Sequence, residues 1–319
     1  LVIAVMVLIG AGMNGAFLST YNVNALLIDV SIIGCLALAE MLVMITGGID
    51  ISIGYIASVS SVMTAFMMLK LEALPAGLNL VLSILSAVIV CALLGALNGI
   101  GVVYLKLPPL VSTLCGMWIA RGVAFYALNG VATPYVVEDI TMLARRGLGP
   151  IPFSLLLLIA ILIYLNYFMR HKETGRNIYA VGGNEYAANI SGVNVRRTKM
   201  LAYVLSSVLA AVGGIILGAY TGSGYARGAA NYEMYAIASA AIGGVSLLGG
   251  VGDPINVFLG VFVLRIINRL MVIAGLSNLS EGLWVGIIII AAMVISTEDF
   301  SGVKSYLRKR RIGYGKPAK

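Results

Sequence analysis

Residues 170–199 read RHKETGRNIYAVGGNEYAANISGVNVRRTK, a polar and basic stretch that contains six Lys and Arg residues. Apolar runs flank it on both sides, at 155–169 and 200–220, and we interpret each run as a bilayer span. Short loops rich in Lys and Arg stay on the cytoplasmic side of a membrane. We therefore expect this loop to lie in the cytoplasm and to contact another protein there.

The composition of the chain is that of a polytopic membrane protein. Hydrophobic residues make up 60% of its 319 residues and charged residues only 11%, against about 25% charged residues in an average soluble domain. The net charge of +8 is concentrated, because 13 of the 21 Lys and Arg residues lie in 170–199 and 304–319. We interpret this charge as a topology signal, and we expect no nucleic-acid partner.

The apolar segments predict an all-α transmembrane bundle of about ten spans, some of them broken or re-entrant. Four spans separate the two basic clusters, so both clusters are expected in the cytoplasm. Six spans precede the first cluster, so the N-terminus is expected there as well and residues 131–150 outside. Residues 1–303 form the membrane domain and 304–319 a basic cytoplasmic tail. Segments 109–129 and 234–249 are alternatively re-entrant or broken. The ten segments are 1–18, 23–45, 53–69, 80–104, 109–129, 151–169, 200–220, 234–249, 254–275 and 281–297.

Two glycine-rich stretches interrupt apolar runs. Residues 46–54 read TGGIDISIG and residues 243–254 read GGVSLLGGVGDP, and they contain the acids Asp50 and Asp253. Irregular backbone at membrane depth is tolerated only where protein or water shields it. These breaks are therefore expected to line a cavity or a packed seam between helices.

Ionisable residues inside spans mark sites of interest because each is costly in lipid unless it is shielded. Glu40 is expected to reach toward the membrane interface, and Asp50 to cap the helix that follows it. Arg265 and Arg269 share one helix face with no acid three or four residues away, so they form either an anion site or, as we favour, a structural seam. The candidate residues for a translocation path are Asp50, Asn98, Arg121, Arg265, Asn268 and Arg269.

Catalytic and metal-binding patterns are missing from the sequence. The one histidine, His171, lies in the basic loop, and no Gly-x-x-x-x-Gly-Lys-Ser/Thr phosphate loop occurs. Cys35, Cys91 and Cys115 have no metal-type spacing and are expected to be buried packing residues. We expect no enzyme activity, no metal and no cofactor in this chain, and no ATP hydrolysis of the phosphate-loop type.

The basic loop is predicted to contain a short helix. Asn184 is a favoured N-cap, Glu185 suits the positive end of a helix, and Gly192 is a typical stop signal. Such a helix projecting from a membrane domain suits insertion into a groove of a partner. A plain amphipathic loop helix is the alternative.

Four segments in order resemble permease subunits of bacterial ABC importers, in the subfamily that carries ribose, xylose, galactofuranose and autoinducer-2. The resemblance runs from about residue 23 to residue 296. It implies a coupling element E-x-A-A-x-x-x-G in the basic loop, formed with its cap by Asn184, Glu185, Tyr186, Ala187, Ala188 and Gly192. The four segments are GGIDISIG (47–54), LKLPPLVSTLCGMWIARG (105–122), GRNIYAVGGNEYAANISGVNV (175–195) and YAIASAAIGGVSLLGGVG (235–252).

The resemblance also implies the partners of the chain. They are a second permease subunit in a homo- or heterodimer, a cytoplasmic ATPase with two fused nucleotide-binding domains that binds ATP-Mg, and a periplasmic or lipid-anchored binding protein. The expected function is import of a small sugar across the bacterial inner membrane by alternating access. A secondary transporter driven by an ion gradient is the alternative, and the absence of a carboxylate relay in the spans argues against it.

Overall fold

The computed structural model describes residues 2–137, 139–145 and 147–275 together with 283, 286, 287 and 290. The predicted span 281–297 lies almost entirely outside the described residues, and the tail 304–319 lies wholly outside them. The described elements in chain order are α1 (Val2–Met13), the 3₁₀ helix η1 (Gly15–Leu18), α2 (Thr20–Ile45), α3 (Ile53–Lys70), α4 (Ala76–Val103), α5 (Pro109–Ala127), β1 (Thr133–Pro134), α6 (Asp139–Arg145), β2 (Gly147–Leu148), β3 (Ile151–Pro152), α7 (Phe153–His171), α8 (Glu173–Gly183), α9 (Glu185–Ile190), α10 (Val195–Thr221), β4 (Ser223–Gly224), α11 (Tyr232–Ile242) and α12 (Pro254–Ile273).

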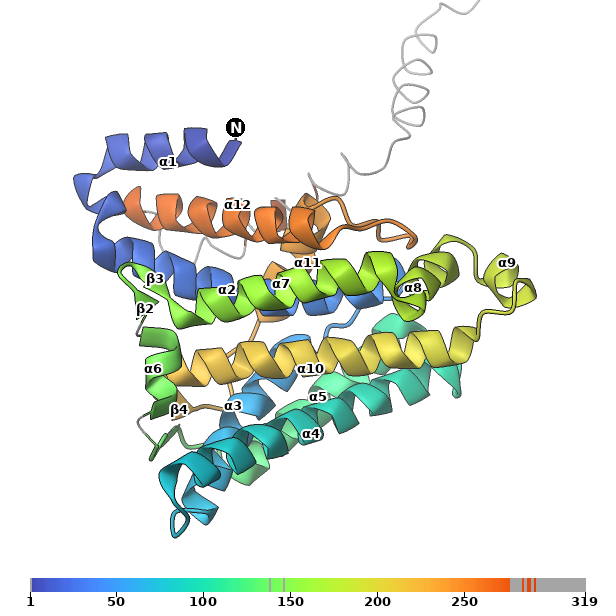
Figure 1. The fold of residues 1–319 in the computed structure, drawn as a ribbon, viewed down its shortest axis with the longest axis horizontal. Helices are drawn as coiled ribbons and strands as arrows, with labels where there is room; N and C mark the ends of the chain where they lie inside the picture. Colours follow the sequence, from blue (N-terminus) through green and yellow to red (C-terminus); the bar gives the residue numbers. More distant parts are fainter. Residues whose placement is uncertain are drawn as a thin grey trace, which may run out of the picture.

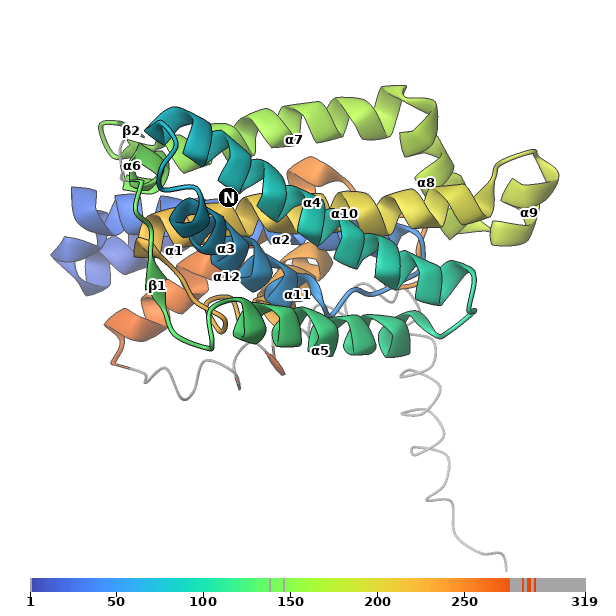
Figure 2. The ribbon, with the colours of Figure 1, turned by 90° about the horizontal axis from the view of Figure 1, so that it is seen from below.

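Long helices run side by side along the longest axis of the molecule. In Figure 1, α2, α7, α10 and α12 follow this axis, and α8 and α9 project at one end, which we call the loop end. The other end, here the hairpin end, carries α6 and two short antiparallel strand pairs. In these pairs Thr133 lies opposite Gly224, and Gly147 lies opposite Pro152. Figure 2 shows α4 and α5 on the outside of the bundle.

Burial follows the distribution of apolar residues. The helix α2 is mostly apolar around its circumference, and its residues from 30 to 45 are all buried, as expected for a helix at the centre of a bundle. In contrast, α4 exposes a stripe of large apolar residues along one face, which is typical of a lipid-facing helix. The residues of this stripe are Leu85, Ile89, Leu93, Leu97 and Ile100.

Seven described helices are long and apolar enough to cross a membrane, namely α2, α3, α4, α5, α7, α10 and α12. The largely helical architecture is thus as predicted, but the count of about ten spans is not confirmed. The predicted span 1–18 is divided, because the Asn14 side chain accepts the N–H of Ala16 and starts η1. The only helix in the predicted span 234–249 is the 11-residue α11, which begins two residues earlier and ends at Ile242, and a glycine-rich loop then leads to α12. The broken alternative for that segment is therefore confirmed.

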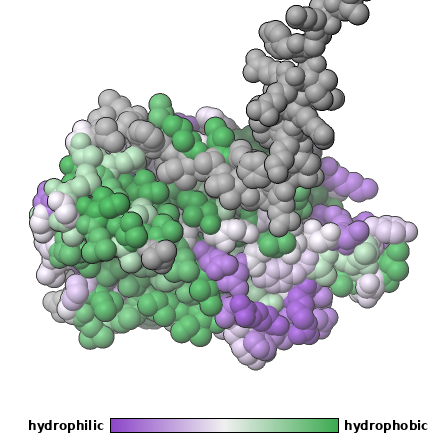
Figure 3. Space-filling view, turned by 90° about the horizontal axis from the view of Figure 1, so that it is seen from above, coloured by the Kyte–Doolittle hydropathy of each residue, from purple (hydrophilic) through white to green (hydrophobic). Residues whose placement is uncertain are grey.

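Polar and apolar surfaces separate along the axis. In the face shown in Figure 3, hydrophobic residues cover most of the body and hydrophilic residues gather toward the end that carries α8 and α9. This distribution fits a body embedded in lipid with a loop end in water.

Candidate functional site

The short helix predicted in the basic loop is present as α9, and its caps are those expected. The side-chain oxygen of Asn184 accepts the N–H of Ala187 at 2.9 Å. At the other end, Gly192 has φ +88°, a left-handed conformation that glycine adopts without a steric penalty. The N–H of Val193 then donates to the carbonyl of Ala188 at 3.0 Å and closes the turn. Local sequence alone therefore sets both ends of α9.

The exposed face of α9 differs from the one expected for docking. Tyr186 and Ile190 are 76% and 69% exposed and form its apolar outer side. Ala188, which was expected to face a partner, is only 5% exposed and packs inward. The contact of α9 with a partner stays a prediction, and the apolar side chains available for it are 186 and 190, which share a face because they are four residues apart. Residue 190 was missed, although this same spacing could have identified it.

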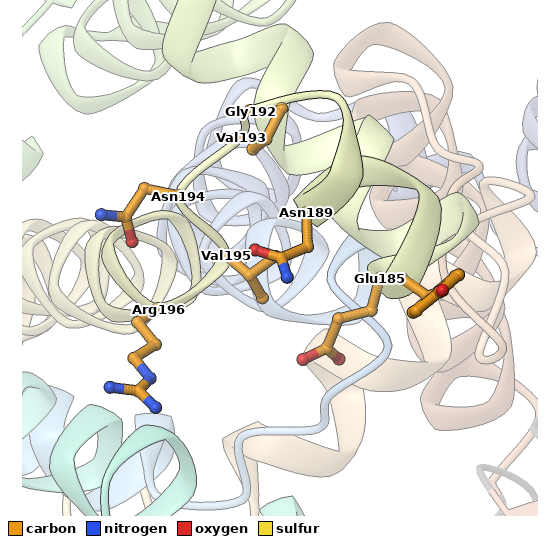
Figure 4. Close-up of a pocket in the computed structure, with 8 residues that line it drawn as sticks. Glu185, Asn189, Gly192, Val193, Asn194, Val195 and Arg196 are labelled. Carbon is orange, nitrogen blue, oxygen red and sulfur yellow. The ribbon is translucent and has the colours of Figure 1, made fainter.

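A groove lies between α9 and the start of α10. It has a volume of about 840 Å³, and the side chains of Glu185, Asn189 and Arg196 project from its walls (Figure 4). Glu185 also forms an ion pair with Lys199 of α10, which fixes α9 against that long helix. The complete lining consists of Glu185, Tyr186, Asn189, Gly192, Val193, Asn194, Val195 and Arg196.

A second helix in the basic loop, α8, was not predicted. It connects the end of α7 to α9 and packs on the residues that precede α12. The Tyr179 hydroxyl of α8 donates to the carbonyl of Gly252 at 2.7 Å. Beside it, Arg170 at the end of α7 forms an ion pair with Asp253 at 2.7 Å. Partial burial disfavours ionisation of Asp253, but hydrogen bonds from Arg170 and from two backbone N–H groups outweigh it and hold the pKa of this carboxyl below its usual value.

Both glycine-rich breaks meet α8 at one point, which we call the glycine junction and define as Gly47, Gly182, Gly249 and Gly250 with the carbonyl of Ile45. The N–H of Gly250 donates to this carbonyl at 2.9 Å. A Cβ atom at Gly182 would overlap the same carbonyl oxygen, and one at Gly249 would lie 2.8 Å from the Gly182 oxygen. The backbones of three segments are therefore in direct contact, which confirms the packed seam expected for the breaks.

The first break also closes a buried polar seam with α2 and α4. The backbone N–H of Asp50 donates to the Glu40 carboxylate at 3.1 Å, and Asp50 accepts the N–H and the hydroxyl of Ser52. The Asn98 amide of α4 then donates to the Ser52 hydroxyl at 2.7 Å. All four side chains are at most 1% exposed, so the seam is sealed from the surface in this conformation.

Two predictions about these acids need correction. Glu40 does not reach the interface, because its side chain is fully buried and turned toward the break. Asp50 stabilises the entry to α3 through Ser52, which precedes the helix, and Ser52 itself caps no N–H of α3 with its side chain. The contact between Glu40 and Asp50 crosses the break and joins residues ten positions apart, which is why spacing on one helix did not show it.

Arg265 and Arg269 have an acidic partner on another helix. Both approach Asp29 of α2, at 3.1 Å and 3.6 Å, and Arg265 also lies over the ring of Tyr235. Asn268 is buried beside them on α12. These residues lie at the seam of α2, α11 and α12, in the arrangement that the favoured structural alternative requires.

Arg121 of α5 lies among aromatic rings. Its guanidinium carbon is 4.7 Å from the ring centre of Trp118, 5.7 Å from that of Phe125 and 5.9 Å from that of Tyr55 on α3. Of the six path candidates, the structure brings together Asp50 and Asn98 in the polar seam and the three α12 residues at the Asp29 seam. Arg121 belongs to neither group.

The three cysteines differ in burial. Cys35 and Cys91 are buried as predicted, whereas Cys115 on α5 is exposed, so the prediction is wrong for that residue. Among the described residues, no three His, Cys, Asp or Glu side chains are grouped so that they could bind a metal ion.

Comparison with known proteins identifies the family. Residues 22–296 match the family described as branched-chain amino acid transport system / permease component. The chain belongs to this permease family.

Individual relatives cover nearly the whole permease. The Ribose import permease protein RbsC of Bacillus subtilis (strain 168) is 32% identical over 296 residues, which are 91% of this chain and 89% of that protein. The Autoinducer 2 import system permease protein LsrC of Enterobacter sp. (strain 638) is 32% identical over 298 residues, 92% of this chain and 84% of that protein. The L-arabinose transport system permease protein AraH of Escherichia coli (strain K12) is 30% identical over 278 residues, 87% and 83% of the two chains. No solved structure matches the permease.

The family assignment and the seven apolar helices make this chain a multi-pass membrane protein and a transport component rather than an enzyme. The helix α9 and the glycine junction lie within the matched residues, as do all six path candidates.

Proposed function

We propose that this permease is the membrane-spanning subunit of an ATP-driven, binding-protein-dependent importer for a monosaccharide or a similar small polyhydroxylated solute. The names of the relatives support the solute class, since two of the three quoted above name a sugar. The glycine junction is the observation that carries the mechanism. It places the basic loop in backbone contact with the ends of two broken helices at once.

Three partners follow from this function. A cytoplasmic ATPase with two fused nucleotide-binding domains binds ATP-Mg and receives α9 in a groove, with Tyr186 and Ile190 as the apolar contacts. A second permease subunit forms the dimer, and an exported or lipid-anchored binding protein delivers solute at the hairpin end. The loop end and both termini therefore lie on the cytoplasmic side of a bacterial cytoplasmic membrane, in accordance with the basic residues of 170–199.

The motion of the ATPase on nucleotide binding reaches the membrane helices through rigid contacts. Closure of the ATPase on nucleotide displaces α9, and the ion pair between Glu185 and Lys199 passes this motion to α10. At the same time α8 moves against Ile45 and Gly250, which end α2 and lead into α12. Because the backbones are in direct contact, α8 has no room to move without moving the two breaks. The bundle then changes between inward- and outward-open states.

The path candidates have different roles in this account. Arg121 remains a residue of the path. Asp50 and Asn98 hold the first break, and Arg265, Asn268 and Arg269 hold the seam of α12, so that each group supports helices that must move. A fixed ion pair with Asp29 suits that supporting role, because it satisfies the arginines within the protein.

A gradient-driven transporter is the second candidate, and the contact between Glu40 and Asp50 favours it. Both acids are fully buried, the backbone N–H of Asp50 donates to the Glu40 carboxylate, and buried acids within spans are found where protons move through membrane proteins. The two functions differ in their energy source, and one reconstitution distinguishes them.

The test is solute uptake by the permease in proteoliposomes that also contain its partner ATPase and binding protein. Radiolabelled ribose and arabinose are offered with the binding protein on the hairpin side and ATP on the loop side. We expect uptake that requires ATP and binding protein and that persists when ionophores remove proton and sodium gradients. Uptake without ATP that ionophores abolish would replace this function by the gradient-driven one.

A further inference from the structure

One face of α5 is exposed although the helix contains an arginine. Cys115, Trp118 and Arg121 follow one another at spacings of three residues, so they lie on one side of the helix. Trp118 is 59% exposed, and the Arg121 side chain is only partly covered. This face differs from the exposed stripe of α4, which contains only apolar side chains.

The guanidinium of Arg121 is held in place by rings and has no acidic partner among the described residues. It lies over Trp118, Phe125 and Tyr55, and the four ion pairs found in the described ranges involve other cations. A second cation, Arg227, lies 5.6 Å from the Phe125 ring centre. Two guanidinium groups thus lie near one ring, and no hydrogen-bond acceptor for their N–H groups is found among the described residues.

Hydrocarbon is an unfavourable environment for this face. An arginine within a spanning helix faces the bundle interior, another protein or a water-filled cavity, because exposure of its charge to hydrocarbon is costly. Tyr55 lies in the first turn of α3, directly after the first break, and irregular backbone at this depth requires the same shielding. The buried seam of Glu40, Asp50, Ser52 and Asn98 shields the break itself, so Arg121 is the feature that indicates an aqueous region beside α5.

We propose that Trp118 and Arg121 form a solute-contact site in the aqueous path, in which the Trp118 ring supports the apolar face of a polyhydroxylated solute and Arg121 donates hydrogen bonds to its hydroxyl groups. This inference rests on the proposed import function and adds the residues that contact the solute. The surrounding rings fix the guanidinium plane in advance, so little conformational entropy is lost when its N–H groups meet hydroxyl acceptors. The site is open on one side, which suits a solute that must pass and not remain bound.

The native Cys115 tests whether this face is lined by water, independently of transport. Because thiol reagents attack the thiolate, and hydrocarbon suppresses thiol ionisation, a charged reagent should label Cys115 about tenfold or more faster than a cysteine in lipid. The matched control is Leu93→Cys in a Cys115→Ser background, because Leu93 is 64% exposed on the apolar stripe of α4. Cys35 and Cys91 are buried and give little background. Labelling of Cys115 as slow as that of Leu93→Cys would overturn the aqueous path.

Contact with the solute is tested by transport in the reconstituted importer. Trp118→Ala should lower uptake per ATP hydrolysed by about tenfold, the effect of losing one aromatic contact, while binding-protein-stimulated ATP hydrolysis stays near the wild-type rate. Arg121→Lys should lower the same ratio, because an ammonium cannot replace the planar fork of donors. Normal uptake by both variants would overturn the solute contact.

Protection of Cys115 by solute and cross-linking of Cys115 test the proposal further. Solute at saturating concentration should slow the labelling of Cys115 in the assembled importer, because it occupies the adjacent site. Disulfide cross-linking of Cys115 between two permease copies would instead make this face a subunit interface and would contradict the proposal. If the wild-type importer moves no sugar at all, the import function fails, and rapid Cys115 labelling would still show a water-lined face.

Discussion

Replacement of Gly182 by alanine tests the glycine junction. The new Cβ would overlap the carbonyl oxygen of Ile45 and lie 2.6 Å from the backbone nitrogen of Gly250, so it would break the hydrogen bond between these two residues. Forcing an extra methyl group into a well-packed contact costs about 1–3 kcal/mol, and the lost hydrogen bond costs about 1 kcal/mol more. We expect α8 to be destabilised on the breaks by about 2–4 kcal/mol.

Gly183→Ala is the matched control, because a Cβ at Gly183 meets no atom within 4 Å. Both substitutions lie at the end of α8 and gain the same helix propensity, so the difference between them isolates the contact. The assays are thermal unfolding of the purified permease and uptake per ATP hydrolysed in proteoliposomes. Gly182→Ala should unfold several degrees lower and hydrolyse ATP with little uptake, whereas Gly183→Ala should resemble the wild type. Equal behaviour of the two variants would refute transmission through the junction.

Three further predictions concern the two ends of the bundle. Tyr186→Ala should weaken binding of the ATPase to the permease about tenfold or more, as is typical for truncation of an exposed aromatic anchor; unchanged affinity in a pull-down titration would remove α9 as the contact. Arg265→Ala should lower the thermal stability of the permease more than Arg269→Ala, because Arg265 is nearer to Asp29, and uptake per folded permease should stay within about threefold for both. Selective loss of transport at normal stability would place Arg265 on the path. The lowered pKa of Asp253 means that its ion pair stabilises the folded loop end above the unfolded-state pKa and that this stability is lost as pH falls through the folded-state pKa. Asp253→Asn keeps the N-cap but removes the charge. Its melting temperature should therefore differ less from that of the wild type below about pH 4. A difference that is constant with pH would show that the charge of Asp253 does not stabilise the loop end.

Features set by neighbouring residues were predictable from the sequence. Asn184 and Gly192 define both ends of α9 through local hydrogen bonds and one left-handed glycine, and both can be identified by residue type. The division of the predicted span 1–18 also has a local signal, because the dipeptide Asn14-Gly15 is typical of a turn and could have excluded one continuous helix.

Contacts between distant residues were not predictable from spacing. Asp29 and Arg265 are 236 positions apart, and only the packing of α2 against α12 brings them together. The same holds for Gly182, which meets Ile45 and Gly250 because α8 folds back over both breaks. Hydropathy also does not show that α11 ends after 11 residues at a glycine-rich loop, so it did not distinguish this broken segment from a complete span.

Protection of α9 by the ATPase tests the central claim most directly. In a Cys115→Ser background, Ser191→Cys reports on the end of α9, and Thr133→Cys reports on β1 at the hairpin end. A membrane-impermeant thiol reagent is applied to intact cells and to inside-out vesicles, with and without the ATPase. The account predicts labelling of Thr133→Cys in cells only, and labelling of Ser191→Cys in vesicles only and blocked by the ATPase. Labelling of Ser191→Cys in intact cells, or in vesicles regardless of the ATPase, would contradict a cytoplasmic α9 that contacts the ATPase.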